Sequence, residues 1–180
     1  MGGSIVTQRE LEKRIERARR DGDIEIHWVE DGFTSLPENI GSLCNLTKLN
    51  LHSNKLTSLP NSIGNLSNLT HLNLSHNKLV KLPESIGNLS NLTHLGLNNN
   101  QLMSLPESIG NLTMLTHLIL NRNHIIKLPK SISKLISLCV LDLDENSLAD
   151  LPNSIDSFVS LFKLTLKGNN VKSLPKILIN

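Results

Sequence analysis

The spacing of proline is the feature that most limits what this chain can fold into. The sequence of 180 residues contains seven prolines, and each lies 23 residues from the next. A series of asparagines keeps the same period, and each of its members closes a stretch of the form L-x-x-L-x-L-x-x-N. The prolines are Pro37, Pro60, Pro83, Pro106, Pro129, Pro152 and Pro175, and the asparagines are Asn54, Asn77, Asn100, Asn123, Asn146 and Asn169. This fixed period predicts a solenoid of short units stacked along one direction.

Within each unit the residues predict a short strand followed by a buried turn. The L-x-L core, as in Leu95-Gly96-Leu97, alternates inward and outward, and identical units stack such strands into a parallel sheet. We expect the asparagine after each strand to point inward, because a carboxamide offers both donors and acceptors to the backbone groups of a buried turn. The L-P pair that follows favours extended chain or a tight turn over a long helix.

One position of the repeat is occupied by glycine in four successive units, at Gly41, Gly64, Gly87 and Gly110. A shared glycine predicts either close packing or a left-handed backbone at that point. Ser133 and Asp156 take the same position in later units, so we do not expect a strict need for positive φ.

The complete pattern, LPxxIGxLxxLxxLxLxxNxL, resembles the 23-residue class of leucine-rich repeat found in intracellular Ras-group and Scribble-type proteins and in many bacterial proteins. The resemblance covers Ile24 to the C-terminus. It implies an α/β fold, a leucine-rich-repeat solenoid in the form of a right-handed curved superhelix. The parallel β-sheet would be concave, and extended or 3-10 segments would form the convex side. It also implies a non-enzymatic protein-binding scaffold without a cofactor or metal, whose partner is chosen by the variable positions.

The N-terminal segment is expected to cover the first coil of the stack. Residues 1–22 are expected to be a capping segment whose helix covers 8–20. Thr7 and Glu10 have the spacing of a capping box at its start. Leu11, Ile15 and Ala18 fall on one helical face, and Gly22 suits the helix end.

The remaining residues, 23–180, are expected to form the solenoid. We divide them into a degenerate first strand at 24–32, six 23-residue repeats at 33–170 and a partial terminal repeat at 171–180. In the first strand Trp28 takes a leucine position and Asp31 takes the asparagine position, so Trp28 is expected in the core. The tail "KILIN" is expected to fold over the C-terminal end and leave a monomer; the alternative is a dimer that pairs through this edge.

Charge and hydropathy narrow the possible partners. The formal net charge is +2, and outside residues 1–22 the two signs balance, so nucleic acid is not expected as a partner. No stretch of about 18 apolar residues predicts a membrane span, and no secretion signal begins the sequence. We expect a cytoplasmic protein, with delivery into a host cell by a non-classical route as the alternative. Cys44 and Cys139 lie about four coils, roughly 20 Å, apart and should stay reduced.

The residues beside the strand leucines are expected to project from the concave sheet and to contact a protein partner. The predicted contact residues are Lys48, Asn50, His52, His71, Asn73, Ser75, His94, Asn98, His117, Asn121, Arg122, Asp142 and Asp144. Interface hot spots are usually Trp, Tyr and Arg, but this surface has no tyrosine and one arginine. The partner is therefore expected to bring aromatic or acidic anchors, unless the affinity is modest. The other interpretations are an accessory segment of a larger protein, an engineered consensus scaffold, or a bacterial effector that acts on host proteins.

Three histidines, His71, His94 and His117, share one position in successive units and should stand in line about 4.8 Å apart. They could hold a metal ion, but no carboxylate or thiol stands beside them to complete a tetrahedron. They could act as catalytic bases, but Ser75 and Asp144 do not supply a nearby nucleophile and acid. The sequence favours a neutral polar recognition surface. Because charged imidazoles this close would repel, the folded state should prefer neutral rings and lose stability as the pH falls through about 6.5.

Overall fold

The computed structural model of this chain describes residues 6–152, 155–156 and 158–172. Pro175 and the "KILIN" tail lie outside the described residues. Most of the expected terminal repeat also lies outside them. The two alternatives for the C-terminal end, a tail that closes it or a dimer that pairs through it, therefore stay predictions.

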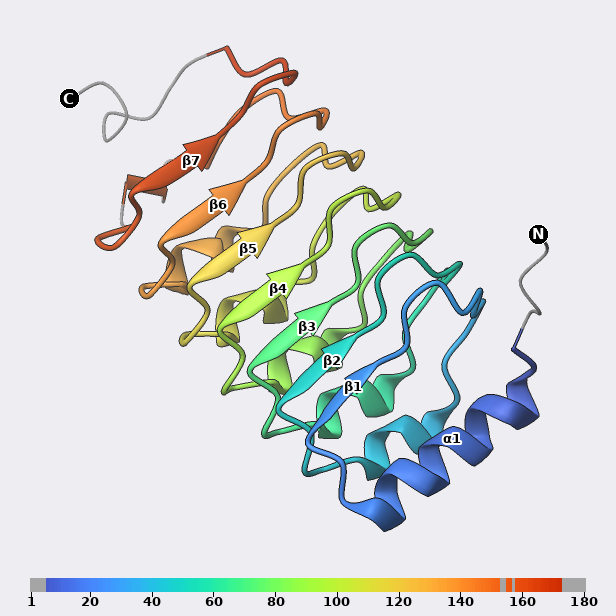
Figure 1. Ribbon diagram of the computed structural model, residues 1–180. Coiled ribbons are helices and arrows are strands. Elements are labelled where there is room, and N and C mark those ends of the chain that lie inside the picture. Colours follow the sequence, from blue (N-terminus) through green and yellow to red (C-terminus); the bar gives the residue numbers. More distant parts are fainter. Residues whose placement is uncertain (1–5, 153–154, 157, 173–180) are drawn as a thin grey trace.

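Seven three-residue strands form one open parallel sheet, and they follow one another in chain order (Figure 1). The strands are β1 (Glu25–His27), β2 (Lys48–Asn50), β3 (His71–Asn73), β4 (His94–Gly96), β5 (His117–Ile119), β6 (Val140–Asp142) and β7 (Lys163–Thr165). Each pairing joins residues 23 positions apart, as Leu72 pairs with Leu95 and Leu95 with Leu118. The predicted strand register is therefore confirmed.

Short 3-10 helices form a second layer behind the sheet, with one helix in each of five successive coils (Figure 1). They are η1 (Glu38–Ser42), η2 (Asn61–Asn65), η3 (Glu84–Asn88), η4 (Glu107–Asn111) and η5 (Lys130–Lys134). Each follows a proline with an extended backbone, for example Pro83 at φ −71° and ψ 152°. Proline supplies no N–H and fixes φ, so the chain turns at this point before a full α-helix can form. The expected 3-10 layer is confirmed.

The core lies between these two layers and consists almost entirely of leucine and isoleucine. In the coil of β4, Leu89, Leu92, Leu95 and Leu97 are all at most 1% exposed. Burial of each such side chain stabilises the fold by about 1.5–3 kcal/mol. Because every coil repeats the same apolar positions, the core is one continuous column that runs along the stack of coils.

Helix α1 (Gln8–Asp21) closes the N-terminal end of this column (Figure 1). The Oγ1 atom of Thr7 accepts a hydrogen bond from the Glu10 backbone N–H at 3.2 Å. Leu11, Ile15 and Ala18 are buried, and Gly22 ends the helix with φ 70°. The predicted cap, buried face and stop are confirmed.

Trp28 departs from the prediction because it is only partly buried. Its ring packs edge-on against Phe33, with 6.1 Å between the ring centroids, and Phe33 is the residue that occupies the core. The first coil has α1 as its neighbour on one side instead of another coil. A large indole at this position therefore covers the junction between helix and sheet.

The predicted asparagine ladder is present in the six coils that follow the first. Asn100 shows its chemistry: Oδ1 accepts from the Leu79 N–H at 2.9 Å, while Nδ2 donates to the carbonyls of Leu74 and Leu97 at 3.0 Å each. Asn54, Asn77, Asn123, Asn146 and Asn169 make the equivalent bonds. In the first coil Asp31 replaces asparagine and pairs with Arg14 of α1 at 2.9 Å.

The residue before each ladder position adopts a left-handed backbone, which the sequence did not predict. Six of the seven residues are not glycine: Glu30, Ser53, His76, Asn99, Arg122 and Glu145, with φ between 54° and 60°. Gly168 takes the same position in the last coil. The glycines at the repeated glycine position have no such conformation, and close packing, not positive φ, explains them.

Candidate functional site

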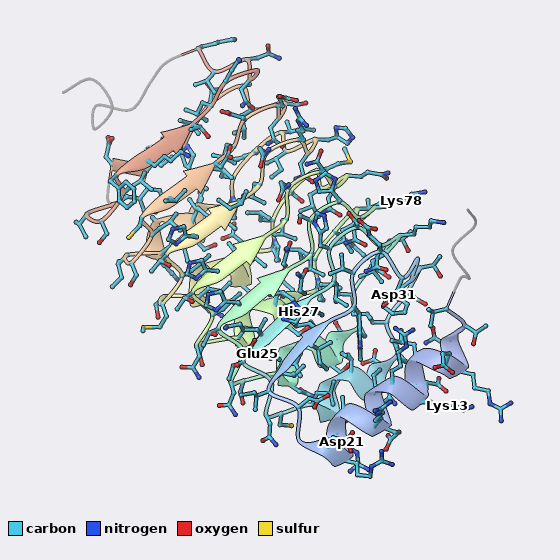
Figure 2. All side chains as sticks on the ribbon, viewed as in Figure 1. Lys13, Asp21, Glu25, His27, Asp31 and Lys78 are labelled. Carbon is cyan, nitrogen blue, oxygen red and sulfur yellow. The ribbon has the colours of Figure 1, made fainter. Side chains whose placement is uncertain are left out.

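The exposed surface of the sheet is called the strand face below. It consists of the first and third residues of each strand and the residue two positions beyond, as in His94, Gly96 and Asn98 of the β4 coil. Figure 2 shows Glu25, His27 and Asp31 along the first coil, beside α1. Central leucines of the strands point the other way, into the core.

A hollow of about 390 Å³ lies on the strand face and is centred on β2–β5. Eight of the thirteen predicted contact residues line it: Lys48, Asn50, His71, Asn73, Ser75, His94, Asn98 and His117. The other five, His52, Asn121, Arg122, Asp142 and Asp144, do not. The sequence did not single out His27, Gly96 or Ile119, which also line the hollow. Gly96 could have predicted the hollow from the sequence, because glycine adds no side chain to the strand face at that point.

The three histidines form a regular stack. The rings of His71 and His94 are 4.3 Å apart between centroids with an 8° angle between planes, and those of His94 and His117 are 4.3 Å apart at 10°. The strand pairing that places these residues side by side makes this stack, and it continues no further because β6 has Val140 at the same position.

A chain of threonines orients the stack. Thr93 Oγ1 lies 2.9 Å from Nδ1 of His94 and donates its hydrogen to the Thr70 carbonyl, also at 2.9 Å. A carbonyl can only accept, so the hydroxyl hydrogen is used there and Nδ1 must carry the hydrogen of the second bond. Thr70 and Thr116 hold His71 and His117 in the same way. Neutral rings are thus Nδ1–H tautomers, and each Nε2 is an acceptor.

The position of His94 in the middle of the stack lowers its pKa. Partial burial is the main cause, and the neighbouring imidazoles of His71 and His117 add to it. Both effects disfavour the charged ring. The direction agrees with the neutral recognition surface that the sequence favours.

The parallel rings are poorly arranged for a metal ion. Zinc needs nitrogen ligands that converge at about 2.0 Å, but the Nε2 lone pairs of parallel rings point the same way. In the part of the chain that the structure describes, no group of three or more His, Cys, Asp or Glu side chains could hold a metal ion. Cys44 and Cys139 are free cysteines.

The structure pairs Ser75 with His52, a contact that the sequence did not predict. The Ser75 hydroxyl lies 2.8 Å from His52 Nδ1 and donates to Oδ1 of Asn73 at 2.6 Å. The serine hydrogen is therefore used, and the imidazole has no role as its base. Ser75 is only 5% exposed, and its hydroxyl supports Asn73 and His52, while its contact with a partner stays a prediction.

Several charged residues on the strand face and beside it are paired or hydrogen-bonded within the protein. Lys48 Nζ lies 2.8 Å from Glu25, which lowers the pKa of that carboxyl group, and Arg122 Nε lies 3.0 Å from Glu145. Asp142 accepts from the Thr165 hydroxyl at 2.7 Å, and Asp144 accepts from a backbone N–H at 2.7 Å. Asp142 and Asp144 thus already have hydrogen-bond partners within the protein.

The stacked coils, the asparagine ladder and the open strand face define a solenoid repeat protein that presents a sheet surface. Comparison with known proteins agrees. Residues 34–120 match the family described as "Leucine-rich repeat region", and residues 113–171 match "Leucine rich repeat". The chain belongs to the leucine-rich repeat proteins. Among curated protein sequences, none matches the chain significantly.

Solved structures share the fold. A leucine-rich repeat protein of Leptospira interrogans has 38% identity and a TM-score of 0.66, over 83% of this chain and 44% of its own. A TDR receptor has 33% identity and a TM-score of 0.70, over 76% of this chain and 25% of its own.

The ectodomain of the plant membrane receptor kinase GASSHO1/SCHENGEN3 from Arabidopsis thaliana, in complex with Casparian strip integrity factor 2, has 25% identity and a TM-score of 0.68. That match covers 89% of this chain and 23% of the receptor chain. The chain thus spans less than half the length of each of these three structures. Within the described residues, no helix is both long and apolar enough to cross a membrane.

Proposed function

We propose that this chain is a protein-binding module that holds a protein partner on its strand face. The observation that carries the proposal is the hollow over β2–β5, which gathers eight predicted contact residues on a rigid sheet. The family binds proteins in general, and the GASSHO1/SCHENGEN3 ectodomain was solved as a complex. These facts support the class of function; the partner itself is open.

The hydrogen-bonding state of the strand face suits recognition. The carboxamides of Asn98 and Asn121 make no hydrogen bond to other described residues, and Asn73 uses only its Oδ1 atom, for Ser75. The three histidines add acceptors at Nε2. Unpaired donors and acceptors on a preorganised surface can bind a partner without the entropy cost of ordering a loop.

We also propose a cytoplasmic location and a monomeric state. Two free thiols suit a reducing compartment, since such compartments keep cysteines unpaired. The experiment below therefore compares a cytoplasmic extract of the native source with extracts of its other compartments.

A pull-down with three variants of one coil tests the proposed face. His94→Glu and Asn98→Glu place a carboxylate on the strand face, whereas Ser90→Glu places the same group on an exposed residue outside this face. We expect the first two to weaken partner binding by at least about 30-fold, the cost of a lost hot spot of 2 kcal/mol. Ser90→Glu should bind like the wild type.

Thermal melts of all variants check that folding is intact. Equal recovery of every captured protein by the wild type, His94→Glu and Asn98→Glu would place the binding surface elsewhere and contradict the proposal. A partner recovered only from other compartments would contradict the cytoplasmic location.

A further inference from the structure

We propose that the hollow at Gly96 is a specific subsite for one aromatic side chain of the partner, a tyrosine or tryptophan whose O–H or N–H donates to the histidine stack. This inference rests on the proposed function and names the chemistry of the anchor. It follows from the shape of the hollow, the tautomer of the histidines and the charge around them.

The shape comes from a missing side chain. Gly96 lies between His94 and Asn98 along β4 and pairs with Asn73 and Ile119 on the neighbouring strands. From the strand geometry, His94 and Asn98 are about 13 Å apart at Cα, and the strands on either side of β4 are about 9.5 Å apart. All five residues line the hollow. Its volume of about 390 Å³ is near the lower end for ligand pockets and suits a side chain or a short segment.

The histidine stack gives this hollow a defined polarity. The Nδ1 atom of His94 faces Thr93, the preceding residue, at 2.9 Å. In an imidazole ring Nε2 lies across from the Cγ–Nδ1 bond, so it points away from Thr93, and His94 is one of the residues that line the hollow. The histidine stack therefore presents hydrogen-bond acceptors to the hollow, and no donor, while its rings are neutral.

Charge and apolar surface decide among the possible ligands. Lys48 is the one charged residue among those that line the hollow, and it is paired with Glu25. A cationic anchor would lie near Lys48 with only neutral acceptors in compensation, and a carboxylate would find lone pairs in place of donors on the stack. Small neutral donors such as serine would leave the apolar surface of Ile119 uncovered. Tyrosine and tryptophan combine an apolar ring with one donor.

The strand face itself supports the same choice. The chain contains no tyrosine, and its single tryptophan, Trp28, packs against Phe33 in the first coil. Aromatic residues dominate interface hot spots, so in a complex of this protein the partner must supply them.

The test uses two probes that differ by one hydroxyl, N-acetyl-tyrosinamide and N-acetyl-phenylalaninamide. Both are titrated into the full ¹⁵N-labelled chain near pH 7.5, and the Gly96 amide and the His94 ring are followed by NMR. We expect both signals to shift and the tyrosine probe to bind about 3–10-fold more tightly, as one hydrogen bond predicts. Equal affinities, or shifts that avoid Gly96, would overturn the proposal.

Three variants make the result specific. Gly96→Leu fills the hollow and should abolish binding of both probes, whereas Asn121→Leu adds the same side chain on the strand face outside the hollow and should not. His94→Phe keeps an aromatic ring but removes Nε2, so the preference for the tyrosine probe should disappear. A preference that survives His94→Phe would overturn the assignment of Nε2 as the acceptor.

The outcomes separate this inference from the proposed function. If His94→Glu and Asn98→Glu lose the protein partner but neither probe binds at Gly96, the protein-binding face stands and the aromatic subsite is wrong. If the probes bind at Gly96 while both variants keep the partner, the proposed function fails and the hollow is only a small-molecule site.

Discussion

His94 lies between two imidazole rings, each from a residue 23 positions away in the chain, and these neighbours set its chemistry. Thr93 fixes its tautomer, and burial together with His71 and His117 lowers its pKa. The asparagines of the ladder also depend on neighbouring coils, but with a different result: all except Asn169 are buried, and their carboxamides bond to the backbone. The asparagine ladder stabilises the core, and the histidine stack forms part of the surface.

The lowered pKa of His94 predicts that stability depends on pH. The ordinary histidine pKa is about 6.5. Its folded-state pKa is lower, so the unfolded chain binds the proton first as the pH falls. Stability should be complete above about pH 6.5, decrease below it, and level off once the folded ring is also protonated. The groups that face His94 are His71 of β3 and His117 of β5.

Chemical unfolding of the wild type and His94→Gln between pH 7.5 and 5.5 measures this effect. Glutamine removes the titrating group, so the variant should lose less stability over the interval. Glu25, Glu38 and Glu107 also have lowered pKa values, but they titrate below about pH 4.5 and do not interfere. Identical pH profiles for the two proteins would contradict the prediction.

At the scale of elements, the 3-10 layer is held by contacts between one coil and the next. A glutamate at the start of a 3-10 helix accepts from the backbone of the following one: Glu84 binds the Ser108 N–H at 3.2 Å, and Glu107 binds the Ser131 N–H at 3.1 Å. Gly87 permits this approach, because a Cβ atom there would lie 2.4 Å from the Ser108 carbonyl oxygen. The short helices are thus packed closer than any side chain would allow.

Gly87→Ala should therefore push η3 and η4 apart. The φ of Gly87 is not positive, so alanine itself fits the backbone and the steric contact with Ser108 remains as the cause. We expect a loss of about 1–3 kcal/mol in the free energy of unfolding, measured by urea denaturation. Gly96→Ala is the control: its Cβ atom would meet the Asn73 side chain at 3.1 Å, and we expect less than about 1 kcal/mol. Equal effects at both glycines would refute the packing argument.

At the scale of the whole molecule, each coil packs only against its immediate neighbours, as in other stacked repeats (Figure 1). On its N-terminal side, the coil of β1 packs against helix α1 instead of another coil. Through Ile15, which is completely buried, and through the ion pair of Arg14 with Asp31, the helix covers the apolar end of the core. Stability near the N-terminus should depend on this helix, and stability in the middle should not.

Ile15→Ala tests this dependence. A buried isoleucine replaced by alanine costs about 2–5 kcal/mol locally. In hydrogen exchange measured by mass spectrometry, we expect faster exchange in α1 and β1, a smaller effect at β2 and none at β5. The same substitution at Ile109, buried in η4, should instead affect the coils on both sides of it. A uniform increase along the chain after Ile15→Ala would mean that the solenoid unfolds as one unit.

Most of the fold could be predicted from the sequence because the same contacts recur in each repeat. Prolines mark where the chain turns, leucines mark the core, and the 23-residue period sets which residues pair. The left-handed residues before the ladder could not be predicted as a series, since Ser53, Arg122 and the two glutamates have no local preference for that backbone, unlike His76 and Asn99. The same backbone occurs at Glu30, which precedes Asp31, so it belongs to the repeated turn itself.

The sequence alone determined the stacking, the strand register, the ladder and the set of side chains that share one surface, because these properties depend only on period and residue type. Tertiary structure decided which of those side chains remain free. It buried Ser75, paired Lys48 with Glu25 and Arg122 with Glu145, and oriented the histidines through threonines of the same and preceding coils. Which hydrogen-bond partner each side chain takes depends on distances of a few ångströms between side chains. The pattern of residues along the sequence does not contain these distances.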